Sequence, residues 1–400
     1  MKLYVFDDRR AGDWRPYALS RPCAELWFGT DSLRGRLERF AGTVASGIIT
    51  RSWLGSFSED GAPPVISSEA LGDDEERLFL CCRAVPDPAA RFEVPDGPAT
   101  LEMEGEIVGA YLPSGSAPPR DDWFADPSPL GGAALVVEGE VLHHVWEMVE
   151  RSADRTAADL ESALPGVPAA PASGGWERLG TASLQLASDV RIEPGVLFDL
   201  RDGPICLDKE VEVRAGTRLS GPLYAGPSSR LLGGSISRLS AGPFSYVRGE
   251  VEESVVLGYA NKAHDGFLGH AYVGRWVNLG ALTTNSDLKN TYGTVRLAGP
   301  AGDVDTGLMK LGCLIGDHVK TAIGTLIPTG AVIGCGANVL SSRPEKWVPA
   351  FSWGGPDTVH RKDGFLRTAE VSASRRGVRF GDKERAWLSE VWDTATAAHR

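Results

Sequence analysis

The chain has few cysteines and no long apolar run. Its six cysteines are scattered over 400 residues, and none of them forms a CxxC pair. This favours a reducing cytoplasm over a disulfide scaffold or a structural zinc site. The sequence shows no signal peptide and no stretch long enough to span a bilayer, so we expect neither export nor membrane insertion.

Basic residues are also fewer than acidic residues. The 41 Lys and Arg residues against 53 Asp and Glu residues give a net charge of −12 at pH 7. This balance argues against nucleic acid as the main partner, and it suits an enzyme of small anionic substrates whose basic residues gather at its site. With 42% hydrophobic residues the chain can build substantial cores, and its length suggests two or three domains.

Glycine is abundant, and aliphatic residues recur at a spacing of six. The 48 glycines exceed the usual share of about 7%. A period of six fits neither an amphipathic helix nor an alternating strand, and it is typical of a hexapeptide β-helix whose glycines turn the corners. An antiparallel β-domain with regular turns is the alternative, which three in-phase runs disfavour. The runs are Leu207, Val213, Leu219, Ala225 and Leu231; then Phe267, Val273 and Leu279; then Ile315, Thr321, Ile327, Ile333 and Val339.

Composition divides the chain into four parts. Residues 1–164 read as a mixed α/β domain, 165–175 as a Pro/Ala/Gly-rich linker, 176–342 as the coil domain and 343–400 as a C-terminal strand and helix. In the first domain we expect a strand at Lys2–Phe6, a helix at Ser32–Phe40, a hairpin at Ala99–Tyr111 and a helix at Val141–Leu164. In the last part we expect a strand at Trp347–Trp353 and a helix capped by Asp382, which packs on the coil or on a neighbouring subunit through Ala386, Leu388, Val391 and Trp392.

The most informative segment runs from Gly242 to Tyr292. It places an arginine, a lysine, a histidine and several asparagines among glycine turns that otherwise keep the aliphatic repeat. Polar residues that interrupt such a coil are expected to meet a ligand. A purely structural scaffold is the alternative, but it would not need these residue types at one break in the coil.

The motifs of this segment resemble the acetyltransferase half of bifunctional N-acetylglucosamine-1-phosphate uridylyltransferase/glucosamine-1-phosphate acetyltransferases. GPFSYVR, which ends at Arg248, matches the family's GPFxxxR, and FLGHAYVGRWVNLGA, from Phe267, matches YLGxxxIGxxxNIGA with the same gaps. The whole chain is closer still to a divergent branch of sugar nucleotidyltransferases. Its marks are FDD…RPxxELxxG from Phe6, GEVExS from Gly249, GYxNKxHxGFLGHxYxGxWxNLGAxTxNSxLKNxYG from Gly258, and PxFSWG ending at Gly354.

The resemblance implies a left-handed β-helix that transfers an acetyl group from acetyl-CoA to an amino-sugar-1-phosphate. His264 falls at the position of the family's catalytic histidine, where it would take the proton of the attacking amine. A structural hydrogen-bonding role is the alternative for a single histidine in a turn. We expect His270 to be structural or to support the residues that contact the substrate without touching it itself.

Other residues of the motif would hold the sugar phosphate. Arg248 aligns with the arginine that binds the phosphate, since a guanidinium gives permanently charged, bidentate recognition. A surface ion pair with Glu250, Glu252 or Glu253 is the alternative. Lys262 is a second candidate phosphate contact, Asn261 and Asn278 are candidates for the sugar hydroxyls, and Phe267 replaces a tyrosine of the family.

The acetyl-CoA site would follow along later turns. Ala281 fits beside the thioester, and Lys320 and Ala322 lie where coenzyme A would extend. Asn285, Ser286 and Lys289 stand at the longest interruption of the coil, Thr284–Met309. By resemblance this interruption completes the site together with a neighbouring subunit of a homotrimer, unless it folds back on its own coil.

The N-terminal domain resembles the nucleotidyltransferases of this superfamily only in part. They hold a nucleoside triphosphate with a glycine-rich loop, an arginine and a later Pro-Lys. Here Asp8, Arg15, Arg21 and Glu25 are the candidate nucleotide-binding residues, but the second glycine and the lysine are missing. Asp7 and Asp8 could hold Mg²⁺ if the domain is active, or could be a solvated turn.

Two alternatives remain for the whole chain. Hexapeptide folds can hold zinc between three histidines, and His264, His270 and His318 are the candidates, but their separations argue against it. The other alternative is a sugar-1-phosphate nucleotidyltransferase whose coil serves only assembly or regulation.

Overall fold

The computed structural model describes residues 1–162, 168, 175–300 and 302–397. These residues form two compact units, which we treat separately. The first comprises Met1–Leu26, Asp31–Val145 and Phe380–Thr394, and the second comprises the described parts of Trp27–Thr30, Trp146–Arg379 and Ala395–Arg400. Most of the predicted linker at 165–175 lies outside the described residues. None of the described helices is long and apolar enough to cross a membrane.

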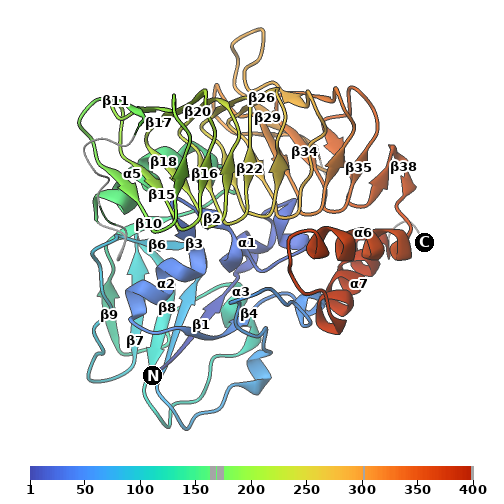
Figure 1. Cartoon of the computed structure of the whole chain (residues 1–400). Helices are drawn as coiled ribbons and strands as arrows, with labels where there is room; N and C mark the ends of the chain where they lie inside the picture. The colour runs from blue at the N-terminus through green and yellow to red at the C-terminus, as the bar shows by residue number, and fades with distance from the viewer. Residues whose placement is uncertain (163–167, 169–174, 301, 398–400) are drawn as a thin grey trace. The chain divides into compact units, whose positions relative to one another are not determined.

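The first unit is built on a mixed six-stranded sheet in the order β4-β1-β5-β8-β7-β9 (Figure 1). β4, β1 and β5 are parallel, β8 is antiparallel to both β5 and β7, and β9 is parallel to β7. The strands of this unit are β1 (Lys2–Phe6), β3 (Asp31–Ser32), β4 (Ala45–Ile49), β5 (Arg77–Cys81), β6 (Ala84–Pro86), β7 (Ala99–Met103), β8 (Glu106–Leu112), β9 (Ala133–Val136) and β10 (Gly139–Val141). The predicted strand at Lys2–Phe6 and the hairpin at Ala99–Tyr111 agree with β1 and with the β7–β8 pair.

Helices cover this sheet and close its core. α2 begins after Ser32, whose hydroxyl accepts a hydrogen bond from Gly35 N, and it ends at Gly42, whose positive φ of 68° suits glycine. This matches the predicted helix at Ser32–Phe40. The helices are α1 (Arg9–Gly12), η1 (Tyr17–Leu19), η2 (Cys23–Glu25), α2 (Leu33–Ala41), η3 (Ser52–Leu54), η4 (Ser68–Ala70), α3 (Asp121–Ala125) and most of α7 (Asp382–Thr396).

α7 corrects the prediction for the C-terminal helix. Leu388 and Val391 are buried as predicted, but Ala386 is exposed and Trp387 is buried beside them. The Trp387 indole donates to Ser20 O at 2.7 Å, and its ring centre lies 4.8 Å from that of Phe57. Asp382 is the first residue of the helix. The helix therefore packs within the first unit.

The predicted helix at Val141–Leu164 begins too early. Val141 ends β10, which pairs with β6, and the helices that follow are α4 (Glu147–Glu150) and α5 (Ser152–Glu161) of the second unit. α5 is fixed there by Asp159, which accepts hydrogen bonds from Thr30 N and Oγ1 and from Arg155.

The second unit is a parallel β-helix with three sides (Figure 1). The first side comprises β11 (Glu177–Leu179), β14 (Leu197–Asp199), β17 (Thr217–Ser220), β20 (Gly234–Ser237), β23 (Glu250–Glu252) and β26 (Phe267–Gly269), with β28 (Thr284–Asn285) and β33 (Leu326–Ile327) paired further along. The second comprises β12 (Leu184–Leu186), β15 (Ile205–Leu207), β18 (Leu223–Ala225), β21 (Ser240–Ala241), β24 (Val255–Val256), β27 (Tyr272–Val273), β31 (Cys313–Ile315), β34 (Ala331–Ile333) and β36 (Trp347–Val348). The third comprises β13 (Arg191–Ile192), β16 (Glu212–Val213), β19 (Arg230–Leu231), β22 (Tyr246–Val247) and β25 (Asn261–Lys262), then β32 (Lys320–Thr321), β35 (Asn338–Val339), β37 (Ser352–Trp353) and the antiparallel β38 (Gly355–Val359).

Single bridges at Asn278 join the two parts of the third side. Another short strand of this unit is β2 (Trp27–Phe28), which is held by hydrogen bonds between Trp27 and the Tyr272 hydroxyl. An α/β domain followed by a hexapeptide β-helix is the predicted fold class, and it is confirmed.

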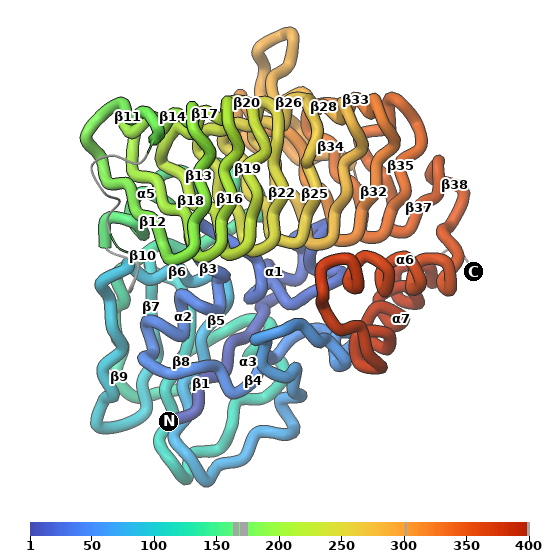
Figure 2. Tube along the Cα trace, in the orientation of Figure 1, coloured from blue at the N-terminus to red at the C-terminus, as the bar shows by residue number. Residues whose placement is uncertain are grey.

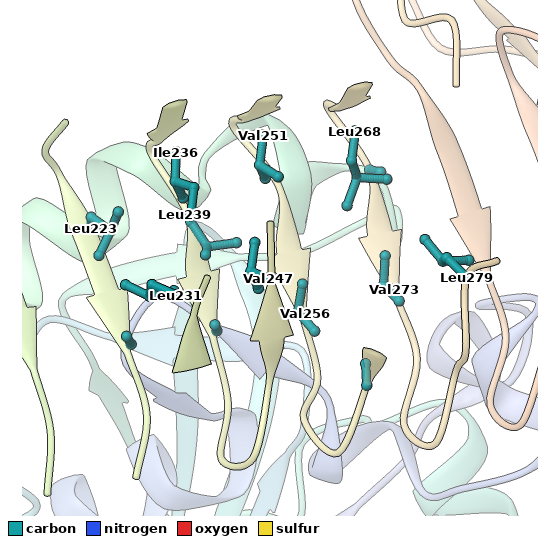
Figure 3. Close-up of a cluster of buried hydrophobic side chains, with 14 of the residues drawn as sticks. Leu223, Leu231, Ile236, Leu239, Val247, Val251, Val256, Leu268, Val273 and Leu279 are labelled. Carbon is teal, nitrogen blue, oxygen red and sulfur yellow. The ribbon is translucent and has the colours of Figure 1, made fainter. Parts of the chain in front are cut away.

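The core of the coil is a stack of aliphatic side chains that point inward from all three sides (Figure 3). The predicted six-residue positions before and after the central motif are buried. Each such side chain contributes about 1.5–3 kcal/mol by leaving water. The stack is the main stabilising feature of this unit.

Phe267 is an exception to the predicted count. Leu268, which is 2% exposed, is the inward residue that stacks on Val251, while Phe267 pairs with Glu250 on the outside. The coils of the motif are shorter than three sides of six; Val256 and Val273, for example, pair at a separation of 17 positions. The aliphatic count therefore slips by one residue here.

Two elements of this unit depart from the coil. After β28 the chain leaves it, pairs β29 (Arg296–Leu297) with β30 (Val304–Asp305), and projects outward (Figure 2). After β38, α6 (Lys362–Ser374) follows, a helix that the sequence reading missed. β36 and β37 fall within the predicted strand Trp347–Trp353.

Candidate functional site

A pocket of about 500 Å³ opens at the corner where the third side of the coil ends. Its lining includes His264, Ala281 and three arginines, Arg214, Arg230 and Arg248. We call it the His264 pocket. It unites the predicted base, the predicted phosphate-binding arginine and the predicted thioester neighbour in one place.

Strand register explains why these residues meet. Val213, Leu231 and Val247 stack in register on the third side, so the residues that follow them reach the same corner in successive coils. Arg214 and Arg248 are two of these followers. The next two coils contribute His264 and Ala281, because Asn261 and Asn278 bridge in parallel. Arg214 and Arg230 were not predicted from the sequence. Arg214 could have been found, because it follows the inward Val213 just as Arg248 follows the inward Val247.

The pocket is positively charged. Arg248 Nε lies 3.1 Å from Asp265 Oδ1, and its Nη1 donates to Leu232 O at 2.8 Å. This ion pair differs from the glutamate pairs considered as the alternative. Arg230 contacts Glu212 outside the lining, and in the described part of the chain Arg214 has no side-chain partner. Asp265 is the one carboxylate in the lining, so the guanidinium groups favour an anionic ligand.

His264 is exposed to this pocket, and its ring has no hydrogen-bond partner among the described residues. The backbone carbonyl of His264 is held by a buried lysine. Lys262 Nζ donates to His264 O at 2.5 Å and to Arg248 O at 2.8 Å, which ties together the turns that carry both residues.

Lys262 itself occupies an inward position of the coil, in register with Val247. Burial lowers its pKa to about 8. Because its ammonium faces backbone carbonyls and it does not line the pocket, the geometry gives it a positioning role in place of the predicted phosphate contact.

Three predicted contacts lie on another surface. Asn261, Asn278 and Lys320 form consecutive positions of the outward row on the third side. Asn261 Nδ2 donates to Asn278 Oδ1 at 2.8 Å, and Lys320 Nζ donates to Trp276 O at 2.5 Å. They line a second cavity, so this chain's structure does not bring them to His264.

The predicted residues around the interruption are also separate from the His264 pocket. Asn285 points into the coil and bonds both Gly269 N and Gly269 O at 2.9 Å. Ser286 accepts from the Thr329 hydroxyl at 2.7 Å, and Lys289 donates to Thr294 O. Two further predicted residues, Phe267 and Ala322, do not line the pocket either.

His270 sits in a separate cluster of charges. Its Nδ1 lies 2.8 Å from Asp287 and its Nε2 lies 3.3 Å from Glu253. Burial lowers the pKa of His270, but the hydrogen bonds to the two carboxylates outweigh burial and raise this pKa to about 9. These contacts agree with the predicted structural role of His270.

The raised pKa of His270 predicts a pH-dependent stability. A histidine with a folded pKa of about 9 and an ordinary unfolded value contributes stability that is full below pH ~6.5 and is lost as the pH rises to about 9. Allowing for solvent screening, we expect a loss of about 1–2 kcal/mol in the free energy of unfolding across this window. Denaturant titrations at several pH values should show this slope in the wild type and not in His270→Gln. His264→Gln is the matched control and should keep the slope, whereas an unchanged slope in His270→Gln would refute the assignment.

The three histidines considered as zinc ligands have different surroundings. His264 lines its pocket, His270 contacts two carboxylates, and the buried His318 stacks on Trp276 and meets Phe365 edge-on. Across the described residues, no group of three or more His, Cys, Asp or Glu is arranged to hold a metal ion.

In the first unit, the predicted metal ligands contact protein donors. Asp7 accepts from Arg51 at 2.7 Å, from the Thr50 hydroxyl at 2.6 Å and from two backbone N–H groups. Asp8 caps α1 through Ala11 N and pairs with Arg83 at 2.7 Å. With their oxygens occupied in this way, these carboxylates do not fit a Mg²⁺ site.

The predicted nucleotide-binding residues are mostly in buried ion pairs as well. Arg21 makes a two-pronged contact with Glu59 at 2.8 and 2.9 Å, and Glu25 accepts from Arg34 at 2.5 Å. Burial raises the pKa of Glu25 despite this arginine. Only Arg15 of the predicted set is exposed. The structure therefore does not gather these side chains around a common ligand.

Comparison with known proteins agrees with both units. Residues 3–164 match the family described as sugar nucleotidyl transferase. The chain is 26% identical over 266 residues to the bifunctional protein GlmU of Bordetella parapertussis, covering 61% of this chain and 51% of that protein. It is 28% identical over 147 residues to a bifunctional sugar-1-phosphate nucleotidylyltransferase/acetyltransferase of Sulfurisphaera tokodaii, covering 34% of this chain and 35% of that protein.

A GlmU of Syntrophomonas wolfei is 30% identical over 145 residues, which are 30% of this chain and 32% of that protein. The chain thus spans about half the length of the curated relatives it matches, or less. The chain is thus similar to sugar nucleotidyl transferases over residues 3–164 and, at 26–30% identity, to bifunctional nucleotidyltransferase/acetyltransferases.

Proposed function

We propose that the coil unit transfers an acetyl group from acetyl-CoA to the amine of an amino-sugar-1-phosphate. The observation that carries this proposal is the His264 pocket, which contains three arginines, a small alanine and an exposed imidazole that has no hydrogen-bond partner among the residues that the structure describes. The relatives described as nucleotidyltransferase/acetyltransferases support the same general reaction.

The chemistry follows from these side chains. Arg248 and Arg214 would hold the phosphate, which leaves the amine to face His264. His264 takes a proton from the amine as its nitrogen attacks the thioester carbon. The new N–C bond forms, the C–S bond breaks, and the thiolate leaves and is protonated by the imidazolium. Ala281 leaves room for the thioester, where a larger side chain would block approach.

The acyl donor would extend along the coils beyond Ala281. Gly324 N donates to Ala281 O, and Ala322 N donates to Val339 O, so the residues at this corner continue in register from one coil to the next. They include the exposed apolar side chains Leu282, Ile323 and Leu340, with 61%, 77% and 50% of their surface accessible. An apolar strip of this kind suits the pantetheine arm of coenzyme A and supports the predicted position near Ala322.

A substrate panel tests the proposal. Hexosamine-1-phosphates with acetyl-CoA are followed by release of free thiol, and hexose-1-phosphates with each nucleoside triphosphate are followed by release of pyrophosphate. Thiol release that depends on the amino sugar supports acetyl transfer. Pyrophosphate release without any thiol release would favour the alternative, a nucleotidyltransferase whose coil serves assembly or regulation.

Nucleotidyl transfer is the second candidate function, and the family match of residues 3–164 favours it. In this reaction a sugar-1-phosphate would attack a nucleoside triphosphate. Because Asp7 and Asp8 already bind protein donors, we derive no metal-assisted step through them. Exposed Arg15 is the predicted residue best able to meet a triphosphate.

We also propose a cytoplasmic location. None of the six cysteines forms a disulfide, and all six are buried. Free thiols without disulfides suit a reducing compartment.

We expect a homotrimer that assembles through the coils. Asn285, Ser286 and Lys289 lie outside the His264 pocket of their own chain, so the family's use of these positions would require a neighbouring subunit. A three-fold arrangement would bury one side of each coil in a closed ring. Light scattering at micromolar concentration should give the mass of a trimer. A monomer with full acetyl transfer would refute the shared site.

A further inference from the structure

A second cavity, of about 630 Å³, lies between the coil and α6 within the second unit. Its floor is the outward row of the third side, where Tyr246, Asn261, Asn278 and Lys320 follow one another in register. Its roof is α6 with the two residues that follow Ser374. We call this cavity the α6 pocket. Tyr246 is the one residue that it shares with the described lining of the His264 pocket.

The α6 pocket concentrates positive charge. Its lining contains Arg367, Arg375, Arg376 and Lys320, and the described lining includes neither aspartate nor glutamate. Within the described chain, none of these four cations pairs with a carboxylate. Burial lowers the pKa of Lys320 to about 8 and also lowers the pKa of Arg376. In a chain with a net charge of −12, a cavity with four cations and no counter-charge is a marked exception.

The aromatic residues around the α6 pocket do not offer free ring faces. Arg376 lies 3.5 Å from the ring centre of Tyr246, and Arg230 lies 5.0 Å from the same ring centre. The rings of Tyr259 and Trp276 pack against each other with their centres 4.5 Å apart. Their remaining faces meet Phe244 and His318. A ligand would therefore be recognised by its charge and not by stacking of a base on these rings.

We propose that the α6 pocket binds a diphosphate group. A phosphate monoester carries at most two negative charges, whereas a terminal diphosphate or inorganic pyrophosphate carries at least one more and spans more of the cavity, so a diphosphate matches the four cations better. Arginine guanidinium groups suit phosphate oxygens, and amide and ammonium groups of Asn278 and Lys320 lie on the floor to complete the contact. This site is independent of the proposed acetyl transfer and goes beyond it.

Inorganic pyrophosphate is the probe that tests this site. Calorimetric titration of the full chain should detect binding that weakens as salt is raised. The double variant Arg367→Gln/Arg375→Gln should bind pyrophosphate about 10²- to 10⁴-fold more weakly, since each of the two lost charged contacts is worth about 10- to 100-fold. Arg361→Gln/Arg379→Gln is the matched control, because it removes the same charge from the same segment outside the lining. Equal weakening in both double variants would overturn the proposal.

A second arm separates the two basic pockets. Arg248→Gln should still bind pyrophosphate at the α6 pocket. If binding is lost in Arg248→Gln and kept in Arg367→Gln/Arg375→Gln, the anion lies in the His264 pocket and the proposal fails. Thiol release is measured on the same variants, so that failure of this site and failure of acetyl transfer are told apart.

A third arm identifies the source of the diphosphate. A nucleoside diphosphate, whose diphosphate is terminal, and a nucleoside diphosphate sugar, whose diphosphate is internal and carries one negative charge fewer, are each titrated in competition with pyrophosphate on the Arg248→Gln variant. Displacement by either one supports the diphosphate site and names its ligand class. Absence of any pyrophosphate binding to this variant, with circular dichroism showing a folded chain, would overturn the proposal.

Discussion

Replacing His264 with alanine should slow thiol release from acetyl-CoA by roughly 10²–10⁴-fold, the usual contribution of a general base. The amine of an amino sugar must lose a proton as it attacks, and the imidazole of His264 is exposed to the pocket without another partner in the described chain. The substitution should leave folding intact because His264 is exposed. Any release of pyrophosphate by the first unit should be unchanged.

His143→Ala serves as the control for this experiment, since His143 belongs to the first unit and contacts Glu106 there. It should leave the rate of thiol release at the wild-type level. The pH profile gives a second readout, because the limb due to the base should disappear in His264→Ala alone. A rate within about threefold of wild type in His264→Ala would exclude His264 as the base.

Replacing Arg248 with alanine should raise KM for the sugar phosphate about 10- to 100-fold while KM for acetyl-CoA changes little. The loss corresponds to one charged hydrogen-bonding contact with the phosphate, about 1.5–3 kcal/mol. Arg214 and Arg230 remain in the pocket, so binding is weakened and not abolished. Initial rates with each substrate varied in turn measure the two constants.

Arg238→Ala is the matched control for Arg248, because Arg238 also lies on the coil and pairs with Glu253 at 3.6 Å but does not line the pocket. It should leave both constants near wild type. Arg248 also contacts Asp265 and Leu232 O, and a purely structural role is the alternative that these contacts offer. Equal increases in the two KM values would indicate that structural role.

The architecture of the coil could be predicted because its signal is repetitive. A six-residue period with glycine at the corners reports the inward positions directly, and these positions are buried as expected. The six-residue period predicted the wrong inward residue at Phe267. The coils of the motif are shorter there, and a lysine, Lys262, occupies an inward position. A charged residue at a core position is invisible to a count of aliphatic residues.

Elements that depend on tertiary contacts were harder to predict. The helix expected from Val141 begins later because Val141 pairs with Ala84 in a strand, and sequence spacing does not reveal such a partner. α6 was missed, although it forms the roof of the α6 pocket. The burial of Trp387 in α7 arises from its contacts with Ser20 and Phe57, which are distant in sequence.

The residues of the His264 pocket that belong to the recognised motif could be predicted from the sequence. Arg248, His264 and Ala281 come from separate coils, and register brings them to one pocket. Arg214 and Arg230 lie before the recognised motif, so the motif alone did not reveal them. Asn278 and Lys320 face a different side of the coil, which explains why they line the α6 pocket instead.

The central claim is that acetyl reaches an amine in the His264 pocket, and the product tests it most directly. The chain is incubated with glucosamine 1-phosphate and acetyl-CoA labelled with ¹³C at the carbonyl, and the label is followed by NMR. We expect the thioester signal to be replaced by an amide signal on the sugar phosphate with wild type and not with His264→Ala. Loss of the thioester signal to free acetate alone, or equal amide formation by both proteins, would contradict the account.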